Sequence, residues 1–311
     1  MPRLLYALLP VVLAVGLLGC DTTATQPESQ VVVEAYLEAE APLRTVRLTR
    51  SVDVDTTYDP QRAALRDADV VLQQLNADSS VATSIPYRES ESDPGVYVPT
   101  RQITVQPQTM YRLQATPPTG EAITATTTVP DTVRAVRTEN DTVTYPTSQE
   151  PEPPQFSLTV RPGTATLERQ NVYVLTATSL LDFQNTPKDS LRRQLTPFYA
   201  DTYDPDTDTL SSFRVNSSGL LNEANFARND DGTLTIRLPW LAVAFYGPNR
   251  IDANVVDDNL YDLLRTQQAQ QMSLAPGEIP NVIEHIDGGT GIFGSYARVG
   301  ADVLVRRSPS E

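Results

Sequence analysis

Three aspartates at alternate positions stand out first in this 311-residue sequence, because their spacing could serve metal chemistry. Asp204, Asp206 and Asp208 could offer carboxylate oxygens to a calcium ion, as the first part of an EF-hand loop does. Such a loop also needs a glycine where Thr209 stands and a bidentate glutamate where Val215 stands. We therefore expect a solvated acidic loop here, with calcium binding as the weaker alternative, and no other metal site.

His285 is the only histidine, so a catalytic triad with a histidine base could use no other residue. It lies between Glu284 and Ile286, and the chain contains no nucleophile-elbow motif. The 39 acidic residues offer many pairs, but spacing singles out none for glycoside hydrolysis. The sequence thus predicts no catalytic residue and no cofactor, and it favours a structural or surface role for the histidine.

Aromatic residues gather in the segment 238–246, which contains Trp240, Phe245 and Tyr246. Trp240 and Tyr246 could form a platform on which a sugar or a peptide stacks. Packing of these rings in a core or between domains is the alternative interpretation, and it is the one that we favour.

A glycine-rich segment lies near the C-terminus, and it could be mistaken for a phosphate-binding loop. Its glycines and their apolar neighbour are Gly288, Gly289, Gly291, Gly294 and Phe293. A phosphate loop would need a helix after it, whereas the residues 296–305 have an extended pattern. We therefore expect a structural turn that lets Ile292 and Phe293 enter the core.

The N-terminus resembles a bacterial lipoprotein signal. Arg3 precedes an apolar run from Leu4 to Leu18, which is short for a membrane-spanning helix and ends in Gly19 and Cys20. The sequence predicts a signal peptide over 1–19, lipidation of Cys20, and a polar tether over 20–29. A plain signal peptide with a cysteine near the cleavage point is the alternative.

Short β-branched segments follow, and they predict a first domain over 30–130. They recur at 31–37, 43–52, 69–75, 95–98, 110–115 and 122–129. Turn residues separate them, and no long helical period is present. This spacing predicts an antiparallel β-sandwich of the immunoglobulin-like or transthyretin-like kind.

The segment 131–154 is rich in proline and predicts a linker or an extended edge segment. A second β-rich domain is expected over 155–311. Its predicted strands are 156–160, 171–178, 233–238 and, more weakly, 213–215. A hairpin turn is predicted at 229–232, and a helix over 257–272 begins with acids that suit its positive end.

Composition limits the possible partners. The chain has 39 acidic and 24 basic residues and a net charge of −15, so its field opposes an approaching phosphate backbone. Nucleic acid is therefore an unexpected partner.

A single cysteine excludes a disulfide framework. Lys188 is the only lysine, which codon composition or adaptation to high salt would each explain.

The chain resembles the domain of unknown function (DUF) 4249 family over nearly its whole length after the signal. The segments that carry the resemblance are Leu17–Cys20, Val31–Leu37, Pro94–Tyr97, Tyr111–Leu113, Thr126–Pro130, Leu260–Tyr261 and, most specifically, Gly288–Gly294. That resemblance implies an outer-membrane lipoprotein of the Bacteroidota type, facing either the periplasm or the cell surface. It also implies a companion role beside a TonB-dependent outer-membrane transporter.

Two functions from different classes remain after the sequence is read. The first is a non-enzymatic, lipid-anchored accessory or binding protein of the cell envelope. The second is a cell-envelope hydrolase that acts on polysaccharide or peptide with carboxylates that the sequence does not single out. Because no nucleophile motif, metal cluster or histidine pair is found, the sequence favours the first.

Overall fold

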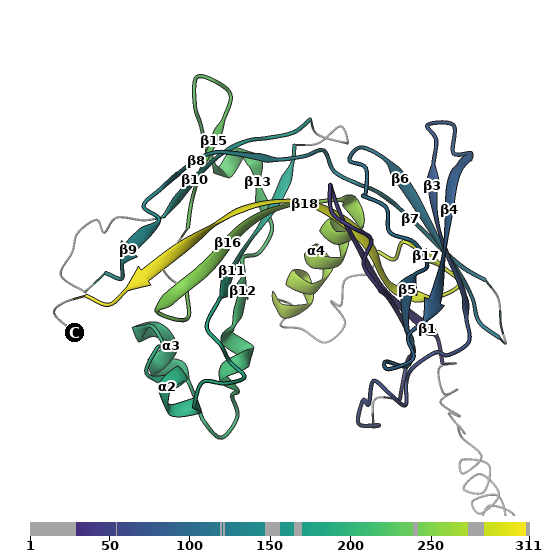
Figure 1. The fold of residues 1–311 in the computed structure, drawn as a ribbon, viewed down its shortest axis with the longest axis horizontal. Coiled ribbons are helices and arrows are strands. Elements are labelled where there is room, and N and C mark those ends of the chain that lie inside the picture. The colour runs from purple at the N-terminus through teal and green to yellow at the C-terminus, as the bar shows by residue number, and fades with distance from the viewer. Residues whose placement is uncertain are drawn as a thin grey trace, which may run out of the picture.

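A computed structural model describes residues 29–53, 55–118, 120, 122–146, 156–164, 170–238, 242–272 and 283–308. The fold is mainly β, as the sequence predicts. Figure 1 shows two lobes beside each other, with one long strand running from one into the other. Among the described residues, none of the helices has the length and apolar character needed to cross a bilayer.

The first lobe contains seven consecutive strands. They are β1 (Val31–Glu38), β2 (Val46–Arg50), β3 (Asp69–Leu75), β4 (Val81–Glu89), β5 (Val96–Pro99), β6 (Met110–Thr116) and β7 (Ile123–Thr128). They pair in the order β1-β2-β5-β4-β3-β6-β7, always antiparallel. In β1 every second residue is buried, which is the alternation expected of a strand with one face on the core.

Residues from the far end of the sequence complete this lobe. β17 (Ile286–Asp287) pairs with β7, and after a tight turn β18 (Thr290–Arg306) runs parallel to β1. Both ends of the row of seven strands are therefore paired with the same C-terminal segment. The predicted first domain, 30–130, thus shares its core with residues of the predicted second domain.

β18 is 17 residues long and belongs to both lobes. Its first part pairs with β1 from Thr290 to Tyr296, and its later part pairs antiparallel with β16 (Gly247–Val256) from Tyr296 to Val305. At about 3.3 Å per residue such a strand extends over roughly 55 Å. A single continuous strand therefore joins the two lobes, as the yellow ribbon of Figure 1 shows.

The second lobe packs two sheets against each other. Its strands are β8 (Arg134–Glu139), β9 (Thr142–Thr144), β10 (Ser157–Arg161), β11 (Val172–Ser179), β12 (Val215–Ser217), β13 (Leu221–Asn222), β14 (Ala227–Arg228), β15 (Leu234–Arg237) and β16. β14, β15, β10 and β8 form a four-stranded sheet, and β11, β16 and β18 continue the large sheet. Apolar side chains of both sheets form one buried cluster.

The structure can be compared with two sequence predictions in this lobe, the proline-rich segment 131–154 and the helix over 257–272. The described part of the segment 131–154 contains β8, an edge strand, and β9, which lies parallel to β18. The predicted helix over 257–272 is found as α4 (Asp258–Met272). The short helices α2 (Lys188–Arg192) and α3 (Pro197–Thr202), and the single turns η1 (Leu210–Phe213) and η2 (Glu223–Asn225), were not predicted.

Candidate functional site

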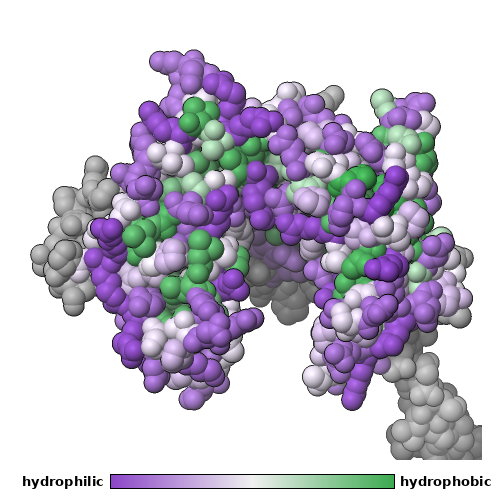
Figure 2. Space-filling model, in the orientation of Figure 1, coloured by the Kyte–Doolittle hydropathy of each residue, from purple (hydrophilic) through white to green (hydrophobic). Residues whose placement is uncertain are grey.

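A cavity of about 750 Å³ lies in the second lobe. Its described walls come from the strands β11, β12, β13, β14 and β15, from the residues that connect them, from α3 and from Ala242. The apolar and aromatic lining residues are Leu175, Tyr199, Leu221, Phe226, Ala227, Leu238 and Ala242. Cavities between about 300 and 1,000 Å³ with mainly apolar walls are typical of small-molecule sites. Figure 2 shows that apolar surface framed by hydrophilic side chains is present on this lobe.

The polar groups of the described lining residues are neutral with one exception. Asn216, Ser217, Ser218, Asn225 and Thr235 offer amide and hydroxyl groups. Some of these groups already have partners, since the Asn216 amide donates to the carbonyl of Ala242 at 3.2 Å. Arg237, an exposed residue at the end of β15, is the one charged side chain among the described lining residues.

Aromatic contacts fix the position of two of the walls. Phe226 packs edge-on against the buried Tyr173, with ring centroids 5.2 Å apart. Tyr199 of α3 packs edge-on against Phe213, with ring centroids 5.4 Å apart. These ring contacts restrict the movement of Phe226 and Tyr199, which favours a cavity that exists before a ligand binds.

A second, smaller cavity of about 230 Å³ lies where α4 meets both lobes. Asp257 is in its wall and immediately precedes α4. The Asp257 carboxylate accepts a hydrogen bond from the Leu260 backbone N–H at 2.9 Å and another from the Thr127 hydroxyl, and it lies 3.2 Å from the Ser295 hydroxyl. These contacts make Asp257 the N-cap of α4.

Burial raises the pKa of Asp257 to about 6, although the hydrogen bonds from Thr127, Leu260 and Ser295 oppose the shift. A carboxyl group with a raised pKa in a cavity wall is a candidate general acid or base. Both oxygens of this carboxylate are, however, engaged by the protein itself. Capping and cross-linking therefore explain its environment better than catalysis does.

The neighbouring Asn259 strengthens the same junction. Its side-chain amide donates to the backbone carbonyls of Thr126 in β7 and Phe293 in β18, both at 2.7 Å. The first turn of α4 is thus attached to two strands of the first lobe. The second-lobe helix and the first lobe are held together by polar contacts as well as by the continuous strand.

The sequence profile named Domain of unknown function (DUF4249) matches residues 20–300. The chain belongs to this family. No curated protein matches the sequence.

Among solved structures, similarity to this DUF4249 protein is remote. Trypsin-activated α2-macroglobulin from Escherichia coli is 10% identical, with a TM-score of 0.21, and the match covers 74% of this chain but only 14% of that one. Three N-terminal domains of the bacteriophage RB49 outer capsid protein Hoc are 11% identical, with a TM-score of 0.22 over 90% of this chain and 71% of that one. The chicken CNTN1 domains FN1–FN3 are 9% identical, with a TM-score of 0.21 over 89% and 67%.

The three aspartates of the calcium candidate lie in an exposed loop of the DUF4249 protein. The Asp204 N–H donates to Asp208 Oδ2 at 2.9 Å, and the Asp206 N–H donates to Asp204 Oδ1 at 3.0 Å. Two of the carboxylates thus close the loop on its own backbone. Within the described ranges, no group of three or more histidine, cysteine or acidic residues is arranged to hold a metal ion.

The remaining predicted residues are distributed over both lobes. His285 Nε2 lies 2.9 Å from Asp262 Oδ2 of α4, and this is its one polar side-chain contact within the described part of the chain. Tyr246 is 2% exposed and packs edge-on against Tyr145, with the Arg307 guanidinium 4.3 Å from its ring centre. Cys20 and Trp240 lie outside the described residues.

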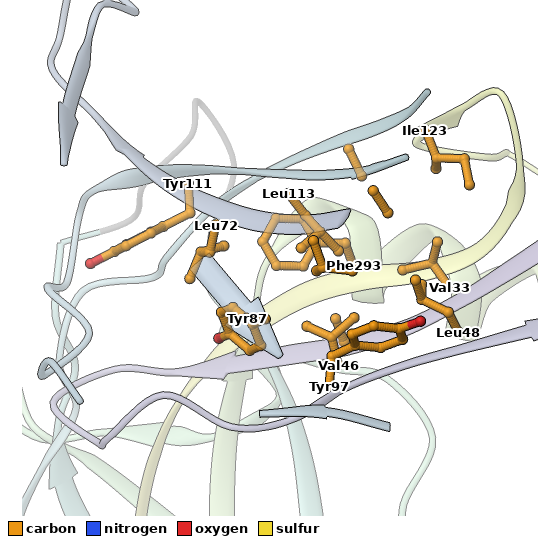
Figure 3. Close-up of a cluster of buried hydrophobic side chains, with 14 of the residues drawn as sticks. Val33, Val46, Leu48, Leu72, Tyr87, Tyr97, Tyr111, Leu113, Ile123 and Phe293 are labelled. Carbon is orange, nitrogen blue, oxygen red and sulfur yellow. The ribbon is translucent and has the colours of Figure 1, made fainter. Parts of the chain in front are cut away.

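The glycine segment of the DUF4249 protein belongs to the first lobe, where it runs from an exposed turn at Gly288 into the core. Phe293 is 1% exposed and points into the core beside Leu113 and Val33 (Figure 3). Gly291 has a φ of +108°, and a Cβ at this position would lie 2.1 Å from the Val33 carbonyl oxygen. At Gly294 a Cβ would lie 2.5 Å from the Leu260 side chain of α4. Close approach of neighbouring elements therefore requires glycine here.

The 750 Å³ cavity was not predicted. Its lining residues are spread from Leu175 to Ala242 and form no motif. The one sequence signal near it is the aromatic segment 238–246, of which Leu238 and Ala242 are in the wall.

Proposed function

We propose that this DUF4249 member is a lipid-anchored accessory or binding protein of the bacterial outer membrane. In this proposal Cys20 carries the lipid, the two β lobes stand beyond a short tether, and the 750 Å³ cavity takes up a small molecule or part of a larger one. The observation that carries the proposal is the cavity itself, because its described walls combine apolar surface with hydrogen-bonding groups but contain no acid–base pair.

The partner in this proposal is a TonB-dependent transporter in the same membrane. The support is the family resemblance, together with the polar contacts and the continuous β18 that hold the two lobes together. Lobes held in this way could present one constant surface to a membrane partner. Cargo bound in the second lobe would then be delivered to the transporter or would gate it.

The partnership is tested by chemical cross-linking of the protein in its own membranes, followed by mass spectrometry of the cross-linked peptides. We expect peptides from the two lobes to be joined to one TonB-dependent transporter. The Cys20→Ser variant, expressed at the same level, is the matched control and should lose these cross-links because it no longer resides at the membrane. If the anchored protein gives no cross-link to such a transporter, the partnership is wrong.

The hydrolase alternative depends on a carboxyl group that could donate a proton, and Asp257 is the best candidate among the described residues. Its role as N-cap of α4 argues for structure instead. An assay of envelope polysaccharides and peptides with the wild-type protein and with Asp257→Asn distinguishes the two. Activity that Asp257→Asn abolishes, while the variant stays folded, would favour the hydrolase.

A further inference from the structure

We propose that the 750 Å³ cavity selects ligands that combine an apolar body with a single anionic group, and that Arg237 binds the anion. The inference rests on the proposed binding function and adds the chemical class of the ligand. It commits to small organic anions, such as carboxylates and sulfonates attached to an aromatic or aliphatic body.

The first step of the argument is the character of the walls. Leu175 of β11 and Leu238, which directly follows β15, are buried, and Phe226 and Tyr199 are partly buried. An apolar ligand body in this space would remove both its own surface and these side chains from water, which is favourable in proportion to the area covered. The cavity volume of about 750 Å³ is sufficient for two or three fused or linked rings.

The second step is the distribution of charge. The chain carries 39 acidic side chains and a net charge of −15, yet no carboxylate is present among the described lining residues. A cation is present instead. Because the one charge among the described lining residues is positive, the cavity of this acidic protein favours an anion at short range.

The third step is that Arg237 has no carboxylate partner among the described residues. Other arginines on or beside the four-stranded sheet do have one: Arg137 with Glu139, Arg161 with Asp231, and Arg228 with Glu223. The guanidinium of Arg237 can therefore form a forked, charge-assisted pair with a ligand carboxylate or sulfonate without first giving up an internal ion pair.

Two fluorescent probes with the same aromatic body test the inference. Anilinonaphthalene sulfonate carries one anion, and N-phenylnaphthylamine is its neutral counterpart. Both are titrated against the chain carrying Cys20→Ser, so that no detergent competes for the probes. We expect both to bind. Arg237→Gln should weaken the anionic probe about tenfold, since a charged hydrogen bond contributes on the order of one factor of ten, and should leave the neutral probe within about twofold.

Two further variants locate the site and control for net charge. Arg137→Gln removes the same charge from the same small sheet at a residue that does not line the cavity, and it should change neither affinity. Ala227→Trp fills the cavity from an exposed wall position and should abolish binding of both probes. Circular dichroism shows whether each variant is folded.

The outcomes test two claims separately, the chemical class of the ligand and the existence of a binding site. If the neutral probe binds and Ala227→Trp blocks it, but Arg237→Gln leaves the anionic probe unchanged, the ligand class is wrong and the binding site stands. If neither probe binds, or if Ala227→Trp has no effect on binding, the cavity is not a ligand site. The proposed binding function then loses its main support.

Discussion

The Thr127 hydroxyl donates a hydrogen bond to the carboxylate of Asp257, although the two residues are 130 positions apart. Thr127 belongs to β7 of the first lobe, and Asp257 caps the helix of the second. Ser295 of β18 contacts both residues, with its hydroxyl 2.7 Å from that of Thr127 and 3.2 Å from Asp257 Oδ2. One small polar cluster therefore joins three elements that no local sequence pattern connects.

Stability should depend on pH through this cluster. The pKa of Asp257 is about 6 in the folded protein against an ordinary value of 3.8, so the folded state binds the proton more tightly than the unfolded state. The contribution of this group to the free energy of unfolding is therefore largest below pH 3.8 and is lost as pH rises through 6. The total loss is roughly 3 kcal/mol.

Asp257→Asn tests this dependence, because an asparagine can still cap α4 but does not titrate. Urea denaturation of both proteins between pH 4 and pH 7 gives the difference between their free energies of unfolding. We expect the free energy of unfolding of the wild type to fall relative to that of the variant as the pH rises. A difference that is constant over this range would contradict the expectation.

Gly291→Ala should destabilise the protein by several kcal/mol, because the new Cβ would meet the Val33 carbonyl oxygen at 2.1 Å and the φ of +108° would also be strained. Gly232→Ala is the matched control. Gly232 has a φ of +79° but open space around its Cβ position, so only the conformational cost of about 1–2 kcal/mol applies. Thermal denaturation measures both. If both variants lost the same stability, the backbone near Val33 would be able to move away from the new Cβ at little cost in free energy.

Phe293→Ala should lower the free energy of unfolding by about 3–5 kcal/mol, which is the usual effect of truncating a buried phenylalanine. The side chain is 1% exposed and packs in the core of the first lobe. Asp287→Ala, at an exposed position of the same segment, is the control and should change stability little. If Asp287→Ala instead abolished a hydrolytic activity in a folded protein, the segment would be an active site.

If Cys20 carries the lipid, as proposed above, Cys20→Ser should move the protein from the detergent-soluble membrane fraction to the aqueous fraction. Each buried methylene of an acyl chain contributes about 0.8 kcal/mol to membrane binding, so loss of the lipid removes the anchor. Phase partitioning followed by immunoblotting measures the change. A variant that partitions like the wild type would show that Cys20 is not the attachment point.

The sequence predicts those elements whose burial follows a simple period. β1 and β3 alternate, β11 is apolar on both faces, and α4 begins at an acidic pair, so all of these were located closely. β16 was missed because Asn249 and Asn254 interrupt its apolar pattern. Both asparagines are buried and donate to backbone carbonyls, Asn249 to that of Phe245 and Asn254 to that of Val174.

The candidate site lies beyond what local patterns can predict. Phe226 directly precedes β14 and Arg237 ends β15, so the pairing of these two strands brings both to the same cavity. Leu175 joins them from the opposite sheet. The spacing of these residues in the sequence does not predict that they line one cavity. Asp257 was expected at the positive end of a helix, but its partner Thr127 depends on how β7 meets α4.

The path of β18 has a consequence for how the protein matures. Tyr296 donates from its hydroxyl to Glu38 Oε2 at 2.9 Å, across 258 positions of the chain. Synthesis delivers the N-terminal end first, so the strands of the first lobe emerge long before the C-terminal segment that pairs with β1 and β7. During that interval two strand edges are open to pairing with other chains. Chaperones would have to shield these edges until nearly all of the polypeptide has been synthesised.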